Sequence, residues 1–145
     1  MRYCSLDDLK LAIPAATLVS LSDDDPMATA INLPVVEEAV KQAEELVDAH
    51  LRGRYNLPLE TVPTVVRDMT VNLARHWLYA RRPEGPELPE AVTRTWKAAL
   101  DLLGNIRDGK LTIGIPDGGN APEPGEVKVR AKSPAFSGNL LEKYR

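Results

Sequence analysis

Few side chains in this sequence have the spacing that catalysis or metal binding needs. Neither His50 nor His76 has a second His or Cys three or four residues away, as two metal ligands on one helix would require. We expect His50 to cap a helix or face solvent, and His76 to make a hydrogen bond on a helix face or between helices. Cys4 is alone, so it cannot form an intrachain disulfide, and it is expected to be partly buried. The sequence therefore assigns no catalytic, metal-binding or cofactor-binding residue and predicts a protein that is not an enzyme.

Acidic and glycine-rich stretches also lack the pattern of a reactive site. The pairs Glu37–Glu38 and Glu44–Glu45 are expected on the solvated face of a helix, where nothing would push their pKa values apart. The run Asp23–Asp25 lacks the alternating ligands and distal Glu of a calcium loop, and is expected to be a solvated loop. The later glycines are not followed by the Gly-Lys-Ser/Thr of a phosphate loop; they are Gly114, Gly118 and Gly119.

Basic side chains offer the clearest binding chemistry, and they gather at two places. The clusters are Arg52 with Arg54, and Arg75 with Arg81 and Arg82. Each cluster is suited to a phosphate backbone or to an acidic neighbour. The alternative for each is a solvated or salt-bridged helix end. Tyr55, beside Arg54, could likewise stack on a base or pack over a pair of helices.

The composition fits one soluble globular domain. Of the 145 residues, 43% are hydrophobic, 27% are charged and only 5% are aromatic, so the core must consist mainly of Leu, Val, Ile and Ala. A net charge of −3 argues against a dedicated nucleic-acid binder, although it allows a local basic patch. No signal peptide is visible and no uninterrupted apolar run reaches roughly 18 residues. We therefore expect a protein that is made in the cytoplasm and has no contact with a membrane.

Two short helices and three long ones are predicted from the spacing of the apolar residues. The short helices are expected at 5–12 and 15–21, with Ser5 and Asp8 forming a capping box on the first. The long helices are expected at 34–52, 63–82 and 89–108. Prolines are placed in the first turn of each long helix; they are Pro34, Pro63 and Pro89.

The apolar stripes of the long helices identify the predicted core. The first stripe is Val36, Val40, Ala43, Val47 and Leu51, widened by Leu46. Glu44 and Asp48 fall largely on its polar side. The second stripe is Val66, Met69, Leu73, Trp77 and Ala80, widened by Val65 and Leu78. The third is Val92, Trp96, Ala99, Leu103 and Ile106. Because the second stripe is the widest, its helix is expected to be central.

Beyond residue 110 the sequence changes character. Leu111–Ile115 is expected to be a brief strand or part of an extended arm, and Val127–Arg130 alternates as a strand edge does. We therefore predict a mainly α fold. Residues 1–110 form a small bundle of three long helices plus short N-terminal helices, and residues 111–145 form an extended C-terminal arm with room for short β strands. The arm's partner-binding candidates are Phe136, Leu140, Leu141, Tyr144 and Arg145, since apolar anchors on a polar arm need another surface to bury them.

Several blocks along nearly the whole chain resemble one known family. They are Tyr3, Leu6–Leu9, the helix pattern from Val36 to Leu51, Arg54–Leu59 with Val62–Pro63, Ala74–Tyr79, and Ile106–Leu111. The most specific block is Arg54, Tyr55, Leu57, Pro58 and Leu59 followed by Pro63. On these residues the chain resembles a Mu-like phage protein family and, through it, the head–tail connector or head-completion proteins of related tailed phages. Ser133–Ser137 resembles the family's C-terminal ending, with Pro134 at the position of a basic residue.

The resemblance implies a structural role in the neck of a virion, between capsid and tail. Such proteins form a ring of identical subunits, commonly twelve, below the portal protein. The ring extends the DNA channel and offers a docking surface to a tail-terminator or another neck or tail protein. DNA passes through without sequence-specific binding, and no cofactor, catalysis or membrane contact is implied. Assembly takes place in the cytoplasm of the bacterial host.

The residues alone leave a second hypothesis open, a small helical DNA-binding or regulatory module of phage origin. It would use the arginines of the two basic clusters. A recognition helix is expected to be basic and accessible, whereas the second long helix carries Met69, Trp77 and Leu78 and is expected to be buried. An enzyme with an unrecognised site is a third class, and no constellation in the sequence supports it.

Overall fold

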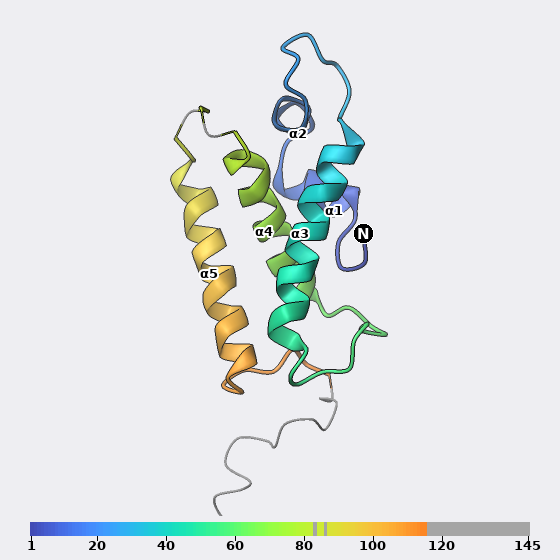
Figure 1. The fold of residues 1–145 in the computed structure, drawn as a ribbon, viewed down its shortest axis with the longest axis vertical. Helices are drawn as coiled ribbons and strands as arrows, with labels where there is room; N and C mark the ends of the chain where they lie inside the picture. Colours follow the sequence, from blue (N-terminus) through green and yellow to red (C-terminus); the bar gives the residue numbers. More distant parts are fainter. Residues whose placement is uncertain (83, 86, 116–145) are drawn as a thin grey trace, which may run out of the picture.

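Five helices make up the described part of the chain in the computed structural model, which covers residues 1–82, 84–85 and 87–115 (Figure 1). They are α1 (Leu6–Ala12), α2 (Ala15–Ser22), α3 (Leu33–Leu51), α4 (Thr64–Ala80) and α5 (Glu90–Arg107). The mainly α prediction is confirmed. Within the described residues there is no strand, so Leu111–Ile115 is irregular chain rather than the brief strand that was one option.

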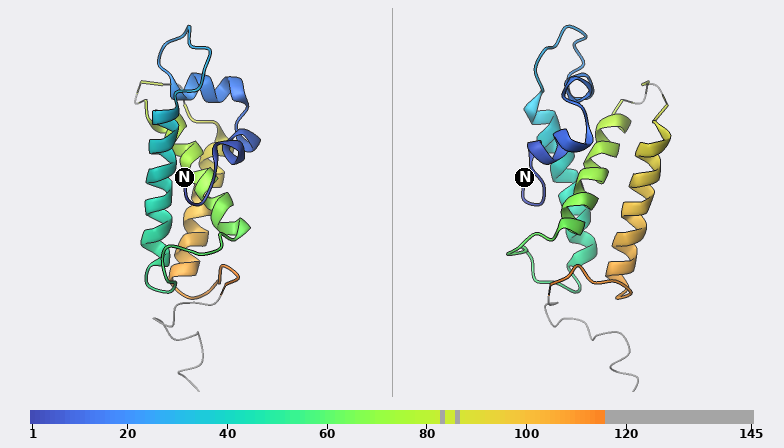
Figure 2. Two further views of the ribbon diagram at one scale, coloured as in Figure 1. Left: turned by 90° about the vertical axis from the view of Figure 1, so that its right-hand side faces the viewer. Right: turned by 180° about the vertical axis from the view of Figure 1, so that it is seen from behind.

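The three long helices lie side by side with α4 in the middle. α4 contacts each of the other four helices, as its wide apolar stripe predicts. α1 and α2 lie on the α3–α4 side of the bundle, and α5 forms the opposite edge (Figure 2). The loop after α2 and the end of α4 lie at one end of the molecule, whereas the α3–α4 connection and the chain after α5 lie at the other.

Local sequence signals predicted each helix end to within two residues of its position in the structure. Ser5 caps α1, and its backbone N–H donates to Asp8 at 2.8 Å, which lowers the pKa of that carboxyl. Pro34 lies in the first turn of α3 as predicted. Pro63 and Pro89 instead stand just before α4 and α5, with extended ψ angles of 152° and 141°. Proline fixes φ but leaves ψ open, so it suits either position.

The predicted stripes form the core, with two exceptions. All five residues of the first stripe are buried, and so are Val66, Met69 and Leu73 of the second. Leu46 is exposed because it lies past the edge of the apolar face of α3, and Ala80 is exposed at the last residue of α4. Ile113 is also buried and Ile115 packs against the core, so the described chain beyond residue 110 still lies on the bundle.

The acidic side of α3 differs from the prediction, because the N-terminal residues cover it. Glu44 and Asp48 are buried rather than solvated. The Tyr3 backbone N–H donates to Glu44 at 2.8 Å, the Tyr3 hydroxyl donates to Asp48, and the Arg2 guanidinium lies 2.9 Å from Asp48. Cys4, next in the chain, is fully buried, and that burial raises the pKa of its thiol to about 12. The thiol therefore stays protonated at neutral pH.

Candidate functional site

Arg54, the first residue of the most specific sequence block, is a buried brace at one end of the bundle. It follows α3 and is only 5% exposed. Its Nη1 donates to the carbonyl oxygen of Ile106, 3.0 Å away, and to that of Leu111, 3.1 Å away. The Ile106 carbonyl belongs to the last turn of α5, beyond the regular helical hydrogen bonds, and it also accepts from the Gly109 backbone N–H at 3.2 Å. One side chain therefore joins the end of α3 to the end of α5.

Tyr55 continues this brace. Its ring is buried, and its hydroxyl accepts a hydrogen bond from the Ile113 backbone N–H at 3.1 Å. The side chain therefore packs in the core, which was one of the two alternatives for it. Arg54 and Tyr55, with their partners Ile106, Leu111 and Ile113, are called the lower junction below. The lower junction fixes the course of the chain after α5.

The rest of that sequence block borders a pocket beside the lower junction. Leu57 and Leu59 pack against the core, and Pro63 stands at the start of α4. The pocket has a volume of about 400 Å³ and is lined by Tyr55, Asn56, Pro58, Leu59, Glu60, Thr61 and Ile115. Ile115, the last described residue, is therefore part of the pocket wall. The arm candidates lie outside the described residues; they are Phe136, Leu140, Leu141, Tyr144 and Arg145.

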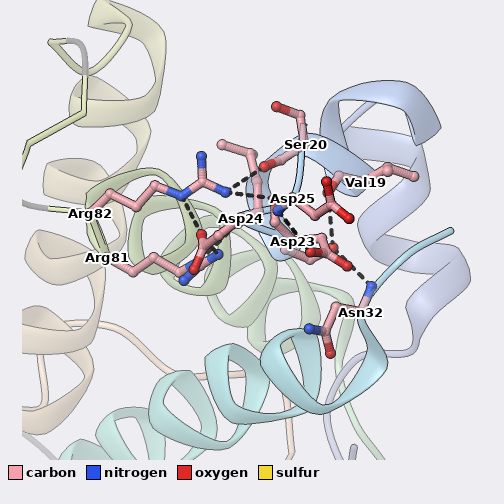
Figure 3. Close-up of polar contacts among 10 residues, drawn as sticks. Val19, Ser20, Asp23, Asp24, Asp25, Asn32, Arg81 and Arg82 are labelled. Atoms are coloured by element: carbon pink, nitrogen blue, oxygen red, sulfur yellow. Dashed lines mark hydrogen bonds and ion pairs between the residues drawn. The ribbon is translucent and has the colours of Figure 1, made fainter. Parts of the chain in front are cut away.

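Arg81 and Arg82 form the second candidate site, at the opposite end of the bundle (Figure 3). Arg81 Nη2 donates to Asp24 Oδ1 at 2.7 Å, and Arg82 Nε lies 2.8 Å from the same oxygen. The hydrogen bond from Arg81 and the positive charges hold the pKa of Asp24 below its usual value. Asp24 comes from the loop between α2 and α3, so the site joins two segments that are far apart in the sequence.

The same two arginines also bind the end of α2. Arg81 Nε donates to the Leu21 carbonyl at 2.8 Å. Arg82 Nη2 donates to the carbonyls of Ser20 at 2.7 Å and Asp23 at 2.9 Å. Their charges therefore complement the carboxyl end of α2. Arg81, Arg82, Asp24 and these three carbonyls are called the upper junction below.

The other candidate residues are dispersed. Arg52 is exposed at the end of α3 and Arg75 donates to Thr95 Oγ1 at 2.8 Å, so each expected basic cluster is split. His76 stacks on Trp96 with ring centres 4.0 Å apart, a ring contact between helices where a hydrogen bond was expected, and its burial lowers its pKa. His50 Nδ1 lies 2.9 Å from the Leu46 carbonyl, one turn earlier in the same helix.

Sequence reasoning missed the partner of the upper junction. Acidic Asp23–Asp25 and basic Arg81–Arg82 were both visible as charged runs, but nothing in the sequence paired them. Ser22 was also missed; it is buried and its hydroxyl accepts from the Asn32 backbone N–H at 3.0 Å, which closes the base of the loop. The opposite signs of the two runs were the available signal, and proximity had to come from the fold.

Among residues 1–82, 84–85 and 87–115, no group of three or more His, Cys, Asp or Glu side chains is arranged to hold a metal ion. None of the five helices described has the length and apolar character needed to span a membrane.

Comparison with known proteins identifies one matching family. The family model described as "Bacteriophage Mu, Gp36" matches residues 3–131. The chain is similar to "Gene product J" of Escherichia phage Mu, with 27% identity over 144 residues that cover 94% of this chain and 95% of that protein. It is also similar to "Mu-like prophage FluMu protein gp36" of Haemophilus influenzae, with 28% identity over 92 residues, 63% of this chain and 62% of that protein.

Proposed function

Because the chain belongs to the bacteriophage Mu Gp36 family, we propose that it is a structural head–tail connector of a Mu-like tailed bacteriophage. In this role it forms a ring of identical subunits, twelve by the resemblance to connectors, below the portal protein. The ring extends the DNA channel and provides the docking surface for a tail-terminator or another neck or tail protein. The protein assembles in the bacterial cytoplasm, ends in the neck of the virion, and needs no catalysis, cofactor or membrane.

The lower junction is the observation that supports this proposal most directly. The residues that carry the resemblance, Arg54 and Tyr55, are buried, and they fasten the chain just before residues 116–145 begin. An adaptor needs a rigid body and a defined starting point for any segment that reaches a neighbour. Closed rings use such heterologous contacts, in which one surface of a subunit meets a different surface of the next.

The C-terminal arm is the proposed contact segment. Its candidates are Phe136, Leu140, Leu141, Tyr144 and Arg145, of which four have large apolar groups in an otherwise polar stretch. Binding on a neighbouring subunit or on the portal would bury those groups. DNA then moves through the channel without sequence-specific binding, and the protein needs no contact with the bases.

The alternative, a DNA-binding or regulatory module, receives less support from the arginines. Arg54, Arg81 and Arg82 direct donors to backbone carbonyls, and Arg81 and Arg82 also contact Asp24. The N–H groups that donate to these carbonyls are occupied, so few donors remain for the row of phosphate oxygens that a DNA backbone presents. Arg52 remains exposed, but a single arginine is a small electrostatic footprint for nucleic acid.

The experiment is a deletion of the gene in a phage that encodes this protein. We expect DNA-filled heads and complete but separate tails by electron microscopy, with infectivity restored when purified protein is added to the lysate. Mass spectrometry of wild-type virions should detect the protein. Joined particles from the deletion phage, or absence of the protein from purified virions, would contradict the connector role.

A truncation tests the arm separately. Protein lacking residues 133–145 should give the circular dichroism of a folded helical protein but fail to restore infectivity. The matched control replaces only the four apolar anchors by Ser at full chain length, and should fail to the same degree. Restoration by the truncated protein would exclude the arm as the contact segment while leaving the connector role intact.

A further inference from the structure

The upper junction holds two arginines in place without help from its carboxylate. Three hydrogen bonds from Arg81 and Arg82 end on the carbonyls of Ser20, Leu21 and Asp23, at 2.7 to 2.9 Å. These oxygens belong to the last turn of α2 and its cap, which are fixed by the fold. The two guanidinium groups would therefore keep their positions if Asp24 left, and a preorganised cation pair is a ready site for an anion.

Asp24 contacts the two arginines through only one of its two carboxylate oxygens. Both arginine contacts go to one oxygen, Oδ1. Arg82 Nε is buried and lies 2.8 Å from that oxygen as an ion pair, but the contact lacks the geometry of a good hydrogen bond. A carboxylate can accept on two oxygens. A carboxylate in a better position could therefore satisfy more donors than Asp24 does.

Asp24 is also free to be replaced. It is 72% exposed and belongs to the loop between α2 and α3. An open pocket of about 530 Å³ adjoins it, lined by Asp24, Arg81, Arg82, Glu84 and Gly85, so an incoming side chain has room to approach. Ion pairs that face solvent contribute little to stability, so exchange of one carboxylate for another costs little.

The surrounding charge indicates which anion fits. Glu84 lies in the pocket wall, and Asp23 and Asp25 flank Asp24 in the loop. A DNA backbone would bring a dense row of phosphates against these three acidic groups. A single carboxylate brings one charge and substitutes for the one it displaces. The site is therefore suited to an acidic side chain of a protein.

We propose that Arg81 and Arg82 form a binding site for a carboxylate of a partner protein, which Asp24 occupies until the partner displaces it (Figure 3). Displacement would release the loop after Asp23, residues 24–31, whose Met27 side chain is already exposed and could join the contact. This inference concerns the isolated chain and does not depend on head–tail joining.

The test is a titration of the full chain, followed by NMR of the arginine Nε–H signals. The probe is the capped peptide acetyl-Gly-Glu-Gly-amide, with the Gln peptide as control. Asp24→Asn should bind the Glu peptide about threefold to tenfold more tightly than wild type, with shifts at Arg81 and Arg82. Asp24→Glu, which retains a carboxylate, should bind as wild type does.

Glu84→Gln is the matched control, because it removes the same charge from the same pocket without vacating the arginines. An equal gain in Glu84→Gln, or no gain in Asp24→Asn, would overturn the proposal. So would tighter binding of a DNA duplex of about 20 base pairs than of the peptide at these arginines. Sedimentation velocity of Asp24→Asn alone then distinguishes the source: self-association indicates a second copy of this chain, and a monomer that binds the peptide indicates a different protein.

Discussion

The two ends of the bundle use the same chemistry in different surroundings. At the lower junction Arg54 binds the carbonyls of Ile106 and Leu111 and is 5% exposed. At the upper junction Arg81 and Arg82 bind carbonyls at the end of α2, but their side chains are 16% and 38% exposed. The Asp24 side chain that both contact is 72% exposed. Each junction ties a helix end to a segment far away in the sequence.

The difference is the access of water. A buried guanidinium and its carbonyl partners have no solvent to replace a lost contact, so the lower junction is a permanent brace. At the upper junction water and salt can compete, so the contact is exchangeable. The same residue type therefore serves the fold at one end and is available for binding at the other.

The largest effect is expected for Arg54→Ala. Loss of the guanidinium leaves the buried Ile106 carbonyl and the part-buried Leu111 carbonyl without this donor, so the free energy of unfolding should fall by about 3 kcal/mol. Urea denaturation followed by circular dichroism measures it. Arg54→Lys should recover part of the loss, since one ammonium cannot reproduce the planar fork. A loss below about 1 kcal/mol would mean that the lower junction is no more essential than a surface contact.

Tyr55→Phe should have a smaller, local effect. The ring still packs, but the Ile113 N–H loses its acceptor, at a cost of about 1 kcal/mol. Hydrogen exchange should show faster exchange at Ile113 than in wild type, with unchanged protection in α4. Equal acceleration throughout the bundle would show that the hydroxyl stabilises the whole fold and not only the chain after α5.

Arg81→Gln should cost less than Arg54→Ala and should depend on salt. We expect a loss of about 1 kcal/mol or less at low ionic strength, because the Leu21 contact is partly replaced by water. The difference from wild type should shrink in 1 M NaCl, where the Debye length is about 3 Å. The Arg54→Ala difference should not shrink. Similar salt dependence at both ends would remove the distinction between the junctions.

The smallest effect concerns the titration of Asp24. The pKa of Asp24 is lowered from the usual 3.8 by the Arg81 hydrogen bond and the two positive charges. The stabilisation of the folded state by this ion pair is therefore fully present above pH 3.8. This stabilisation is lost as the pH falls through the lowered pKa of Asp24. NMR of the Asp24 carboxyl should give a midpoint below 3.8 in wild type, and a midpoint closer to 3.8 in Arg81→Gln. The carbonyl acceptors of Arg54 do not titrate, so these two contacts of the lower junction should not change over this range.

Much of the fold could be predicted from local patterns. Ser5 with Asp8, Pro34 and the stripe from Val36 to Leu51 are signals contained within one or two helical turns, and each was confirmed. Glu44 and Asp48 could not be predicted in the same way. Their positions on α3 look polar, and only the return of the N-terminus over them makes them buried.

The sequence predicted which arginines belong to the candidate site, but it did not predict the groups that they bind. For Arg54, Arg81 and Arg82 the sequence left open a phosphate, an acidic neighbour or a solvated or salt-bridged helix end. The backbone carbonyls that they bind have no signature in the sequence. Every residue has a carbonyl, so only the three-dimensional position of a helix end selects which ones are reached.

The sequence by itself determined the helices, the central place of α4, and the family, because apolar spacing and a compact motif are read along the chain. The tertiary structure decided the roles of the arginines. Burial made Arg54 a brace, and the meeting of α2 with the end of α4 placed Arg81 and Arg82 against Asp24 at the surface. Those roles depend on access of water and on contacts between distant segments, and both exist only once the helices have packed.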